Sequence, residues 1–179
     1  MKILSVVGAR PQFIKAFAVS KELRTEHEEV LVHTGQHYDE ELSDVFFEKL
    51  NIPQPDYNLG VGSGSHGEQT GEMLIRLEEL IADETPDFVL LYGDTNSTLA
   101  GMIAGTKMDT KVAHVEAGLR SHNREMPEEI NRVLTDHGSD LLLAPSPTAV
   151  DQLSAEGRDG MTVETGDVMY DALLAVLTE

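Results

Sequence analysis

The chain has 179 residues, with 32 Asp and Glu against 13 Lys and Arg, so its formal net charge is −19. This length predicts one domain, and the surplus of carboxylates excludes a nucleic-acid binder with a basic surface and argues against docking on anionic lipid. The lack of cysteine excludes disulfides, thiolate metal sites and thiol nucleophiles and fits a cytoplasmic protein. No apolar stretch approaches the roughly 18 residues of a membrane-spanning helix.

The acidic surplus has two interpretations. It can keep a protein soluble through self-repulsion, or it can suit a salt-rich cytoplasm, where the Debye length falls to about 3 Å at 1 M salt. Lysines are sparse and the acids cluster on expected outer faces, as at Glu78-Glu79 and Asp83-Glu84. We favour the halophilic interpretation as a hypothesis.

The first half of the chain alternates between strand and helix patterns. A buried strand over 2–7 ends at Gly8, and the apolar stripe that follows predicts a helix with Pro11 in its first turn. Taken in order, the predicted elements are a strand over 2–7, a helix over 11–24, a strand over 30–33 and a helix over 39–50. Residues 51–67 are rich in Pro and Gly and predict a long irregular stretch.

The second half continues the alternation. Ser65 and Glu68 form a capping-box pattern that opens a helix. The elements predicted from there are a helix to about 83, a strand over 88–92, a helix over 97–107, a strand over 111–115, a helix over 127–138, a strand over 140–144, a helix over 146–156, a strand over 161–164 and a terminal helix that Asp167 caps.

Strands that are apolar throughout and alternate with helices are typical of the α/β class. The pattern predicts a doubly wound, mostly parallel sheet. In such a sheet, ligands bind beyond the carboxyl ends of the strands. Polar residues at three strand ends are therefore the candidates for function.

The first of these ends is Gly8-Ala-Arg-Pro-Gln-Phe-Ile-Lys15, a glycine turn that leads into a helix. Free N–H groups at a helix N-terminus favour anions, and Arg10 and Lys15 could bind a phosphate. Solvated surface cations are an equally good interpretation of the two residues. The motif GxGxxG is absent, so a nicotinamide dinucleotide is not indicated.

The second end is Gly93-Asp-Thr-Asn-Ser-Thr98. Its simplest interpretation is a group of helix-capping residues, and the functional alternative is that Asp94 transfers a proton.

The third end is His114-Val-Glu-Ala-Gly-Leu-Arg120, followed by Pro127-Glu-Glu-Ile-Asn-Arg132. Glu116 leaves the strand, and Glu128 falls in the first turn of the next helix, where an acid also suits the helix dipole. Arg132 could simply pair with Glu128 four residues earlier. Three carboxylates and several arginines nevertheless meet at one sheet edge.

These segments, together with His33-Thr-Gly-Gln-His37 and Gly166-Asp-Val-Met-Tyr-Asp-Ala-Leu173, resemble the UDP-N-acetylglucosamine 2-epimerase family in order along the whole chain. The resemblance implies one half of a two-domain fold of the glycosyltransferase-B type, with the active site between two Rossmann-like domains. Residues 1–167 would form the N-terminal domain, and 168–179 a helix that leads to a second domain outside this chain.

The family resemblance also implies a reaction. The epimerases invert C2 of a UDP-linked 2-acetamido sugar by eliminating UDP and adding it back, which needs an acid, a base and stabilisation of the departing diphosphate. By similarity, Asp94, Glu116 and Glu128 are the acid/base candidates. The substrate-binding candidates are Arg10, Lys15, Gln36, His37, Thr95, Arg120 and Arg132. No metal or redox cofactor is implied, because elimination itself makes the C2 proton labile.

The resemblance leaves alternatives open. Asp39 and the loop Gly62–Thr70 depart from enzymes that a second substrate molecule activates, and Ala9, Gln12 and that loop resemble the branch acting on UDP-2,3-diacetamido-2,3-dideoxy-glucuronic acid. A hydrolysing relative and a non-catalytic isolated domain are further alternatives. The expected partners are a UDP-sugar, the second domain and a second copy in a homodimer, with neither nucleic acid nor membrane.

Overall fold

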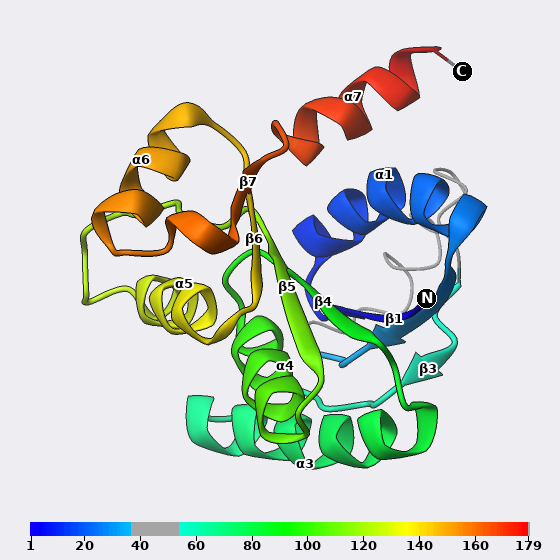
Figure 1. Cartoon of the computed structure of the whole chain (residues 1–179). Coiled ribbons are helices and arrows are strands. Elements are labelled where there is room, and N and C mark those ends of the chain that lie inside the picture. Colours follow the sequence, from blue (N-terminus) through cyan, green and yellow to red (C-terminus); the bar gives the residue numbers. More distant parts are fainter. Residues whose placement is uncertain (37–53, 179) are drawn as a thin grey trace.

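A computed structural model describes residues 1–36 and 54–178 (Figure 1). Its centre is a sheet of seven parallel strands in the order β3-β2-β1-β4-β5-β6-β7. The strands are β1 (Lys2–Val7), β2 (Glu28–His33), β3 (Tyr57–Asn58), β4 (Phe88–Tyr92), β5 (Lys111–Val115), β6 (Leu141–Ala144) and β7 (Thr162–Glu164). This arrangement confirms the predicted doubly wound α/β fold.

The helices connect these strands close to the predicted positions. They are α1 (Arg10–Glu26), α3 (His66–Glu84), α4 (Asn96–Lys107), α5 (Pro127–Gly138), α6 (Pro147–Ala155) and α7 (Val168–Thr178). A short 3-10 helix, Asp159–Met161, precedes β7 and was not expected. The helix predicted over 39–50 lies outside the described residues.

Two predicted helix caps are confirmed. The Ser65 hydroxyl accepts the Glu68 N–H at 3.3 Å, and the Glu68 carboxylate accepts the Ser65 N–H at 3.2 Å, which is the reciprocal capping box. The Asp167 carboxylate accepts the Met169 N–H at 2.9 Å and so caps α7. Local sequence therefore fixes where these two helices begin.

The stretch 51–67 differs from the expectation because it contains β3. The Asp56 carboxylate accepts the Leu31 N–H at 2.8 Å, and the Asp56 N–H donates to the Leu31 carbonyl at 2.8 Å. These bonds place Tyr57 and Asn58 opposite Val32 and His33. Such a two-residue strand has no hydrophobic alternation of its own, so only its pairing partner reveals it.

The sheet is buried on both faces. Leu4 and Val6 pack under α3 and α4, whereas Ile3 and Val7 pack under α1, as the alternation of side chains along a strand requires. A smaller apolar cluster under α6 contains Leu142 and Leu153. Apolar runs such as Phe88–Tyr92 therefore read as buried strands from the sequence because both faces of each strand are covered.

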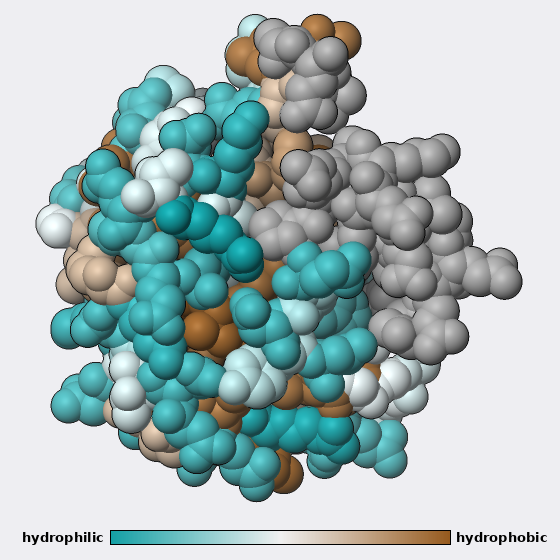
Figure 2. Space-filling model, turned by 90° about the vertical axis from the view of Figure 1, so that its right-hand side faces the viewer, coloured by the Kyte–Doolittle hydropathy of each residue, from teal (hydrophilic) through white to brown (hydrophobic). Residues whose placement is uncertain are grey.

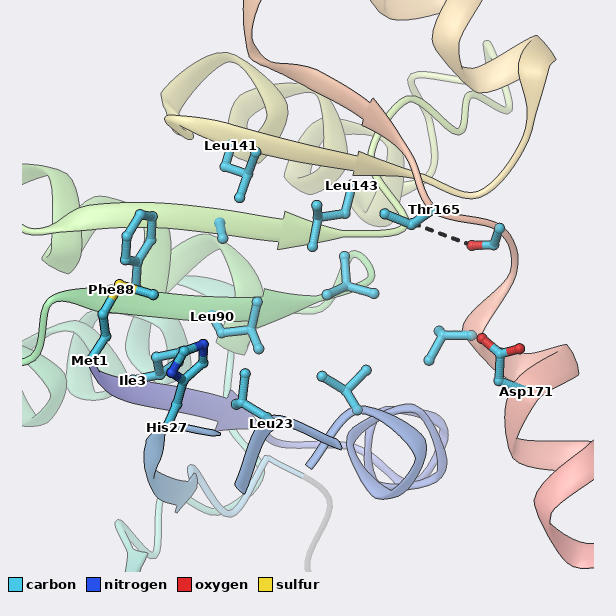
Figure 3. Close-up of a pocket in the computed structure, with 15 residues that line it drawn as sticks. Met1, Ile3, Leu23, His27, Phe88, Leu90, Leu141, Leu143, Thr165 and Asp171 are labelled. Atoms are coloured by element: carbon cyan, nitrogen blue, oxygen red, sulfur yellow. Dashed lines mark hydrogen bonds between the residues drawn. The ribbon is translucent and has the colours of Figure 1, made fainter. Parts of the chain in front are cut away.

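The direction of winding leaves part of one face thinly covered. Right-handed crossovers place α1 on one face and α3, α4 and α5 on the other (Figure 1). On the α1 side, α7 is the only other described helix over β4 to β6, and an apolar cavity of about 370 Å³ lies there. Figure 3 shows side chains of this apolar cavity, Phe88, Leu90, Leu141 and Leu143 among them, between the strands and these helices.

The outer surface is largely hydrophilic on the face shown in Figure 2, where hydrophobic residues form small separate areas. Within residues 1–36 and 54–178, no helix has both the length and the apolar character needed to cross a bilayer.

Candidate active site

The candidate site lies where the strand order reverses, at the carboxyl ends of β1 and β4. A cavity of about 500 Å³ opens there, bordered by the first residues of α1, α3, α4 and α5. Four of the predicted site residues line this polar cavity: Gln36, Asp94, Thr95 and Glu128. Sequence positions up to 92 residues apart are thus brought to one cavity.

Gln12 ties the ends of β1 and β4 together. Its side chain is buried; the amide oxygen accepts the N–H groups of Gly8 at 2.8 Å and Ala9 at 3.0 Å. The amide nitrogen donates to the Tyr92 carbonyl and to the Thr98 hydroxyl. Sequence reasoning missed this role, although Gln12 stood inside the first motif.

The contacts of Gln12 correct one expectation. Free N–H groups at the start of α1 were predicted to attract an anion, but those of Gly8 and Ala9 are already bound to the Gln12 side chain. Gly8 also has no room for a side chain, because an added Cβ would lie 2.0 Å from the Ser97 hydroxyl. The end of β1 is therefore a tightly packed support for the site.

The start of α4 is capped by side chains, as the first interpretation of Gly93–Thr98 predicted. Thr95 is the N-cap, and its hydroxyl accepts the Thr98 N–H at 3.4 Å. The Gln36 amide oxygen accepts the Ser97 N–H at 3.1 Å and its hydroxyl at 2.7 Å. Gln36, a predicted substrate-binding residue, thus also fixes the N-terminus of α4.

The Gly93–Asp94 turn stands between two ion pairs. Lys15 pairs with Glu116, and both side chains are largely buried. On the other side, Arg132 pairs with Asp94. A Cβ added to Gly93 would lie 3.3 Å from the Lys15 ammonium nitrogen and 3.6 Å from a Glu116 carboxylate oxygen. Two candidate carboxylates and two candidate cations therefore surround this one turn.

Glu116 has a φ of +68°, which non-glycine residues seldom adopt. Such backbone strain persists where the surrounding structure demands it, and it is concentrated at functional sites. The glycine two residues later, Gly118, has a φ of +84°, and a Cβ there would lie 2.4 Å from the Ala149 carbonyl oxygen. The loop after β5 is therefore fixed in a conformation that aims Glu116 at Lys15.

Glu128 and Glu129 have different environments at the start of α5. Glu128 is exposed and lines the polar cavity. Glu129 is buried and accepts the N–H groups of Ser121 and His122, both at 2.9 Å. Burial raises the pKa of Glu129, but these hydrogen bonds outweigh that effect and lower it.

Arg132 does not pair with Glu128, which was one interpretation of their spacing. Its guanidinium contacts Glu129 at 3.1 Å and pairs with Asp94. The pairing three residues apart wins because Glu129 faces inward and Glu128 faces the cavity.

Arg120 is not brought together with the other predicted residues. Its side chain is buried and pairs with Asp136 at 2.6 Å and with Glu156 at 2.7 Å. Its guanidinium also donates to the Leu119 carbonyl at 2.7 Å. The hydrogen bond from Arg120 lowers the pKa of Glu156 to about 2. Arg120 therefore joins the loop after β5 to α5 and α6.

A chain of amides crosses the starts of three helices. The Asn131 side chain donates to the Asp94 carbonyl at 3.0 Å and to the Asn96 side chain at 3.2 Å. The Asn96 amide donates to Gln69 at 2.9 Å and lies 3.2 Å from the His66 ring. The sequence offered no signal for these contacts, since each residue by itself is an ordinary polar residue of a helix.

Two predicted site groups fall outside the description: His37 as a whole and the side chain of Arg10. Among the residues that are described, no group of three or more His, Asp or Glu side chains is arranged to hold a metal ion.

Comparison with known proteins gives the same relatives by sequence and by structure. A protein of Methanococcus maripaludis described as a UDP-N-acetylglucosamine 2-epimerase homolog is 60% identical over 99% of this chain and 50% of its own length. The UDP-2,3-diacetamido-2,3-dideoxy-D-glucuronate 2-epimerase of Pseudomonas aeruginosa is 53% identical over 97% of this chain and 51% of its own.

The comparison with solved structures finds proteins of the same description. The UDP-GlcNAc 2-epimerase of Methanocaldococcus jannaschii, solved with UDP-GlcNAc and UDP, superposes with a TM-score of 0.96 at 47% identity, over 99% of this chain and 50% of that one. The chain thus spans about half the length of the relatives it matches. Because the family model described as UDP-N-acetylglucosamine 2-epimerase matches residues 21–179, this chain belongs to the UDP-N-acetylglucosamine 2-epimerase family.

Proposed function

We propose that this chain supplies the N-terminal half of an enzyme that interconverts UDP-N-acetylglucosamine and UDP-N-acetylmannosamine. The observation that carries the proposal is the polar cavity at the switch point, where Asp94 and Glu128 face the same hollow. Glu116 stands beside them, paired with Lys15 across the Gly93 turn. Carboxylates on more than one side of a hollow suit a reaction that removes a proton from one face of a sugar and returns it to the other.

In the proposed reaction, a carboxylate takes the C2 proton while the C1–O bond breaks and UDP leaves with the bonding electrons. The product is a 2-acetamidoglucal. UDP then adds back to C1, and C2 receives a proton on the opposite face. Asp94, Glu116 and Glu128 are the proposed acid/base groups, and the charge of the departing diphosphate calls for cations.

The proposed binding residues are Arg10, Lys15, Gln36, His37, Thr95 and Arg132. Lys15 and Arg132 are positioned beside the carboxylates by their ion pairs. We propose a positioning role for Arg120 in place of direct binding, because its guanidinium is already bound to Asp136 and Glu156.

A second substrate is favoured by one observation. The Pseudomonas aeruginosa relative, named for UDP-2,3-diacetamido-2,3-dideoxy-D-glucuronate, is 53% identical to this chain, against 49% for the Methanococcus maripaludis UDP-N-acetylglucosamine 2-epimerase. The diacetamido uronate is therefore the alternative substrate for the same chemistry.

The test joins this chain to a second half of the kind its relatives carry and supplies both UDP-sugars. Formation of UDP-N-acetylmannosamine supports the first proposal, and epimerised uronate supports the second. Release of free N-acetylmannosamine with UDP would identify a hydrolysing enzyme. If the joined enzyme leaves both substrates unchanged, the catalytic proposal fails, and titration of the chain alone with UDP-GlcNAc then decides whether it is a binding domain.

The remaining proposals concern the whole protein. We propose that 1–167 form its N-terminal domain, that 168–179 lead to the second domain, and that the intact enzyme is a cytoplasmic homodimer that supplies sugars for cell-surface polysaccharides. The net charge of −19 supports a salt-rich cytoplasm. Equal stability in dilute buffer and in molar KCl would rule out that last proposal.

A further inference from the structure

A buried histidine stands directly behind the Gly93–Asp94 turn. His114 lies in β5, and its side chain is 1% exposed. Its Nε2 lies 2.6 Å from the Gly93 carbonyl oxygen, and its Nδ1 lies 2.7 Å from a carboxylate oxygen of Asp136. A carbonyl oxygen can only accept a hydrogen bond, so Nε2 must carry a hydrogen.

The second ring nitrogen faces the Asp136 carboxylate, whose other contacts favour its ionised form. The other oxygen of Asp136 accepts the Gly118 N–H at 3.0 Å and an Arg120 N–H at 2.6 Å. Burial by itself raises the pKa of Asp136, but the hydrogen bonds and charges of His114 and Arg120 outweigh it and lower the pKa. An ionised Asp136 accepts from Nδ1, so both nitrogens of His114 are donors.

The charges around this pair balance. Asp136 on α5 faces His114, Arg120 from the loop after β5 faces Asp136, and Glu156 at the end of α6 faces Arg120. The half-exposed His137 also contacts Glu156, with its Nε2 3.0 Å from a carboxylate oxygen. Beyond Gly93 stands the Lys15–Glu116 ion pair, which is neutral by itself. One imidazolium and one guanidinium therefore match two carboxylates, and a buried positive charge on His114 is compensated.

The pair holds both turns that carry candidate catalytic groups. His114 fixes the carbonyl of Gly93, whose φ is +63°, and Asp94 follows directly. Asp136 fixes the N–H of Gly118, two residues after the strained Glu116. A displacement at either contact moves Asp94 or Glu116 relative to the other.

We propose that His114 is a permanent imidazolium, held by Asp136, and that the two are positioning residues that set the Asp94 turn and the Glu116 loop in register for proton transfer. The positioning part rests on the proposed epimerase function, whereas the charge of His114 does not.

The charge is tested by NMR of the 179-residue protein labelled with 15N-histidine, with the His114 signals assigned by their loss in His114→Gln. The expected result is a ring protonated on both nitrogens at about pH 7.5, with both nitrogens giving the shifts of an imidazolium. Asp136→Asn is expected to convert His114 to the neutral ring by about pH 7.5. A neutral His114 in the unmodified protein at that pH would overturn the proposal.

Positioning is tested in the enzyme joined to its second half. His114→Gln keeps one donor nitrogen and is expected to lower kcat about 10- to 100-fold with KM within about twofold, as expected for misplaced catalytic groups. The matched control is His137→Gln, which removes the exposed histidine at the far end of the same network and should leave kcat within about twofold. An unchanged kcat in His114→Gln would overturn the positioning role. Lack of activity in the unmodified joined enzyme would instead overturn the proposed function and leave the NMR result standing.

Discussion

Two hollows lie against the same sheet and differ in almost every respect. The polar cavity at the carboxyl ends of β1 and β4 is bordered by Asp94, Glu128 and amide side chains that are bound to one another. The apolar cavity between α1 and α7 is lined mainly by side chains such as Leu90, Leu141 and Leu143 (Figure 3). Their volumes are similar, about 500 Å³ and about 370 Å³, so size does not identify the site.

The two cavities differ in how their lining side chains are held. Around the polar cavity, hydrogen bonds from Gln12, Asn131 and His114 join strand ends and helix starts, as the precise placement of functional groups requires. At the apolar cavity, the winding direction leaves α1 and α7 as the only described helices over this side of the sheet. Preorganised polar groups indicate chemistry, whereas the open apolar face reflects topology.

The largest expected effect is on turnover at the polar cavity. Glu116→Gln in the joined enzyme should lower kcat roughly 10²- to 10⁴-fold if the carboxylate transfers a proton. Steady-state kinetics measure this, with Glu125→Gln in the exposed loop as the matched control. A near-normal rate for Glu116→Gln would reduce the residue to a partner for Lys15.

The next effect compares packing on the two faces of β6. Leu142 is fully buried in the cluster under α6, and its neighbour Leu143 lines the apolar cavity. Leu142→Ala should lower the free energy of unfolding by about 2–5 kcal/mol, and Leu143→Ala by no more than about half as much, because part of its surroundings is already empty. Urea unfolding measures both. Equal losses would show that the apolar cavity is filled or closed in solution.

A third effect appears on acidification. His33, at the end of β2, is buried and stacks on Phe13 with ring centroids 4.8 Å apart. Burial lowers the pKa of His33 from 6.5 to about 4. Because the unfolded chain takes up this proton more readily, the stability should fall as the pH drops from about 6.5, by roughly 2 kcal/mol at pH 5.

His33→Gln should remove that slope, whereas His122→Gln at an exposed position should retain it. The free energy of unfolding measured between about pH 8 and pH 5 separates the two. A slope that survives in His33→Gln would assign the acid sensitivity to other groups.

The smallest effect tests the Gly93 turn. Gly93 and Gly157 both have positive φ, +63° and +75°, but only Gly93 has neighbours at the position of an added Cβ. Each substitution by Ala should cost about 1–2 kcal/mol for the left-handed backbone. Only Gly93→Ala should also lower turnover, since its methyl group would press on Lys15. Similar turnover in both variants would contradict a role for close packing at this turn.

The sequence by itself determined the order of elements and the location of the site. Parallel strands buried on both faces appear as apolar runs such as Phe88–Tyr92, and helix starts such as Ser65–Glu68 have local caps. The winding that follows from this alternation places the polar strand ends at one edge. Asp94, Glu116 and Glu128 could therefore be named as candidates without coordinates, from their place at strand ends or a helix start and from family resemblance.

Only the tertiary structure decided which side chains pair. Lys15 pairs with Glu116, which lies 101 residues later in the chain. Arg132 pairs with Glu129 and Asp94, and Arg120 pairs with Asp136. His114 and Gln12 acquire their roles in the same way, through strand register and helix placement. Spacing along the chain does not determine which of several acceptors within reach a donor side chain will bond. The outcome depends on which polar groups lose their contact with water when they are buried. That competition exists only once the sheet and its helices have assembled.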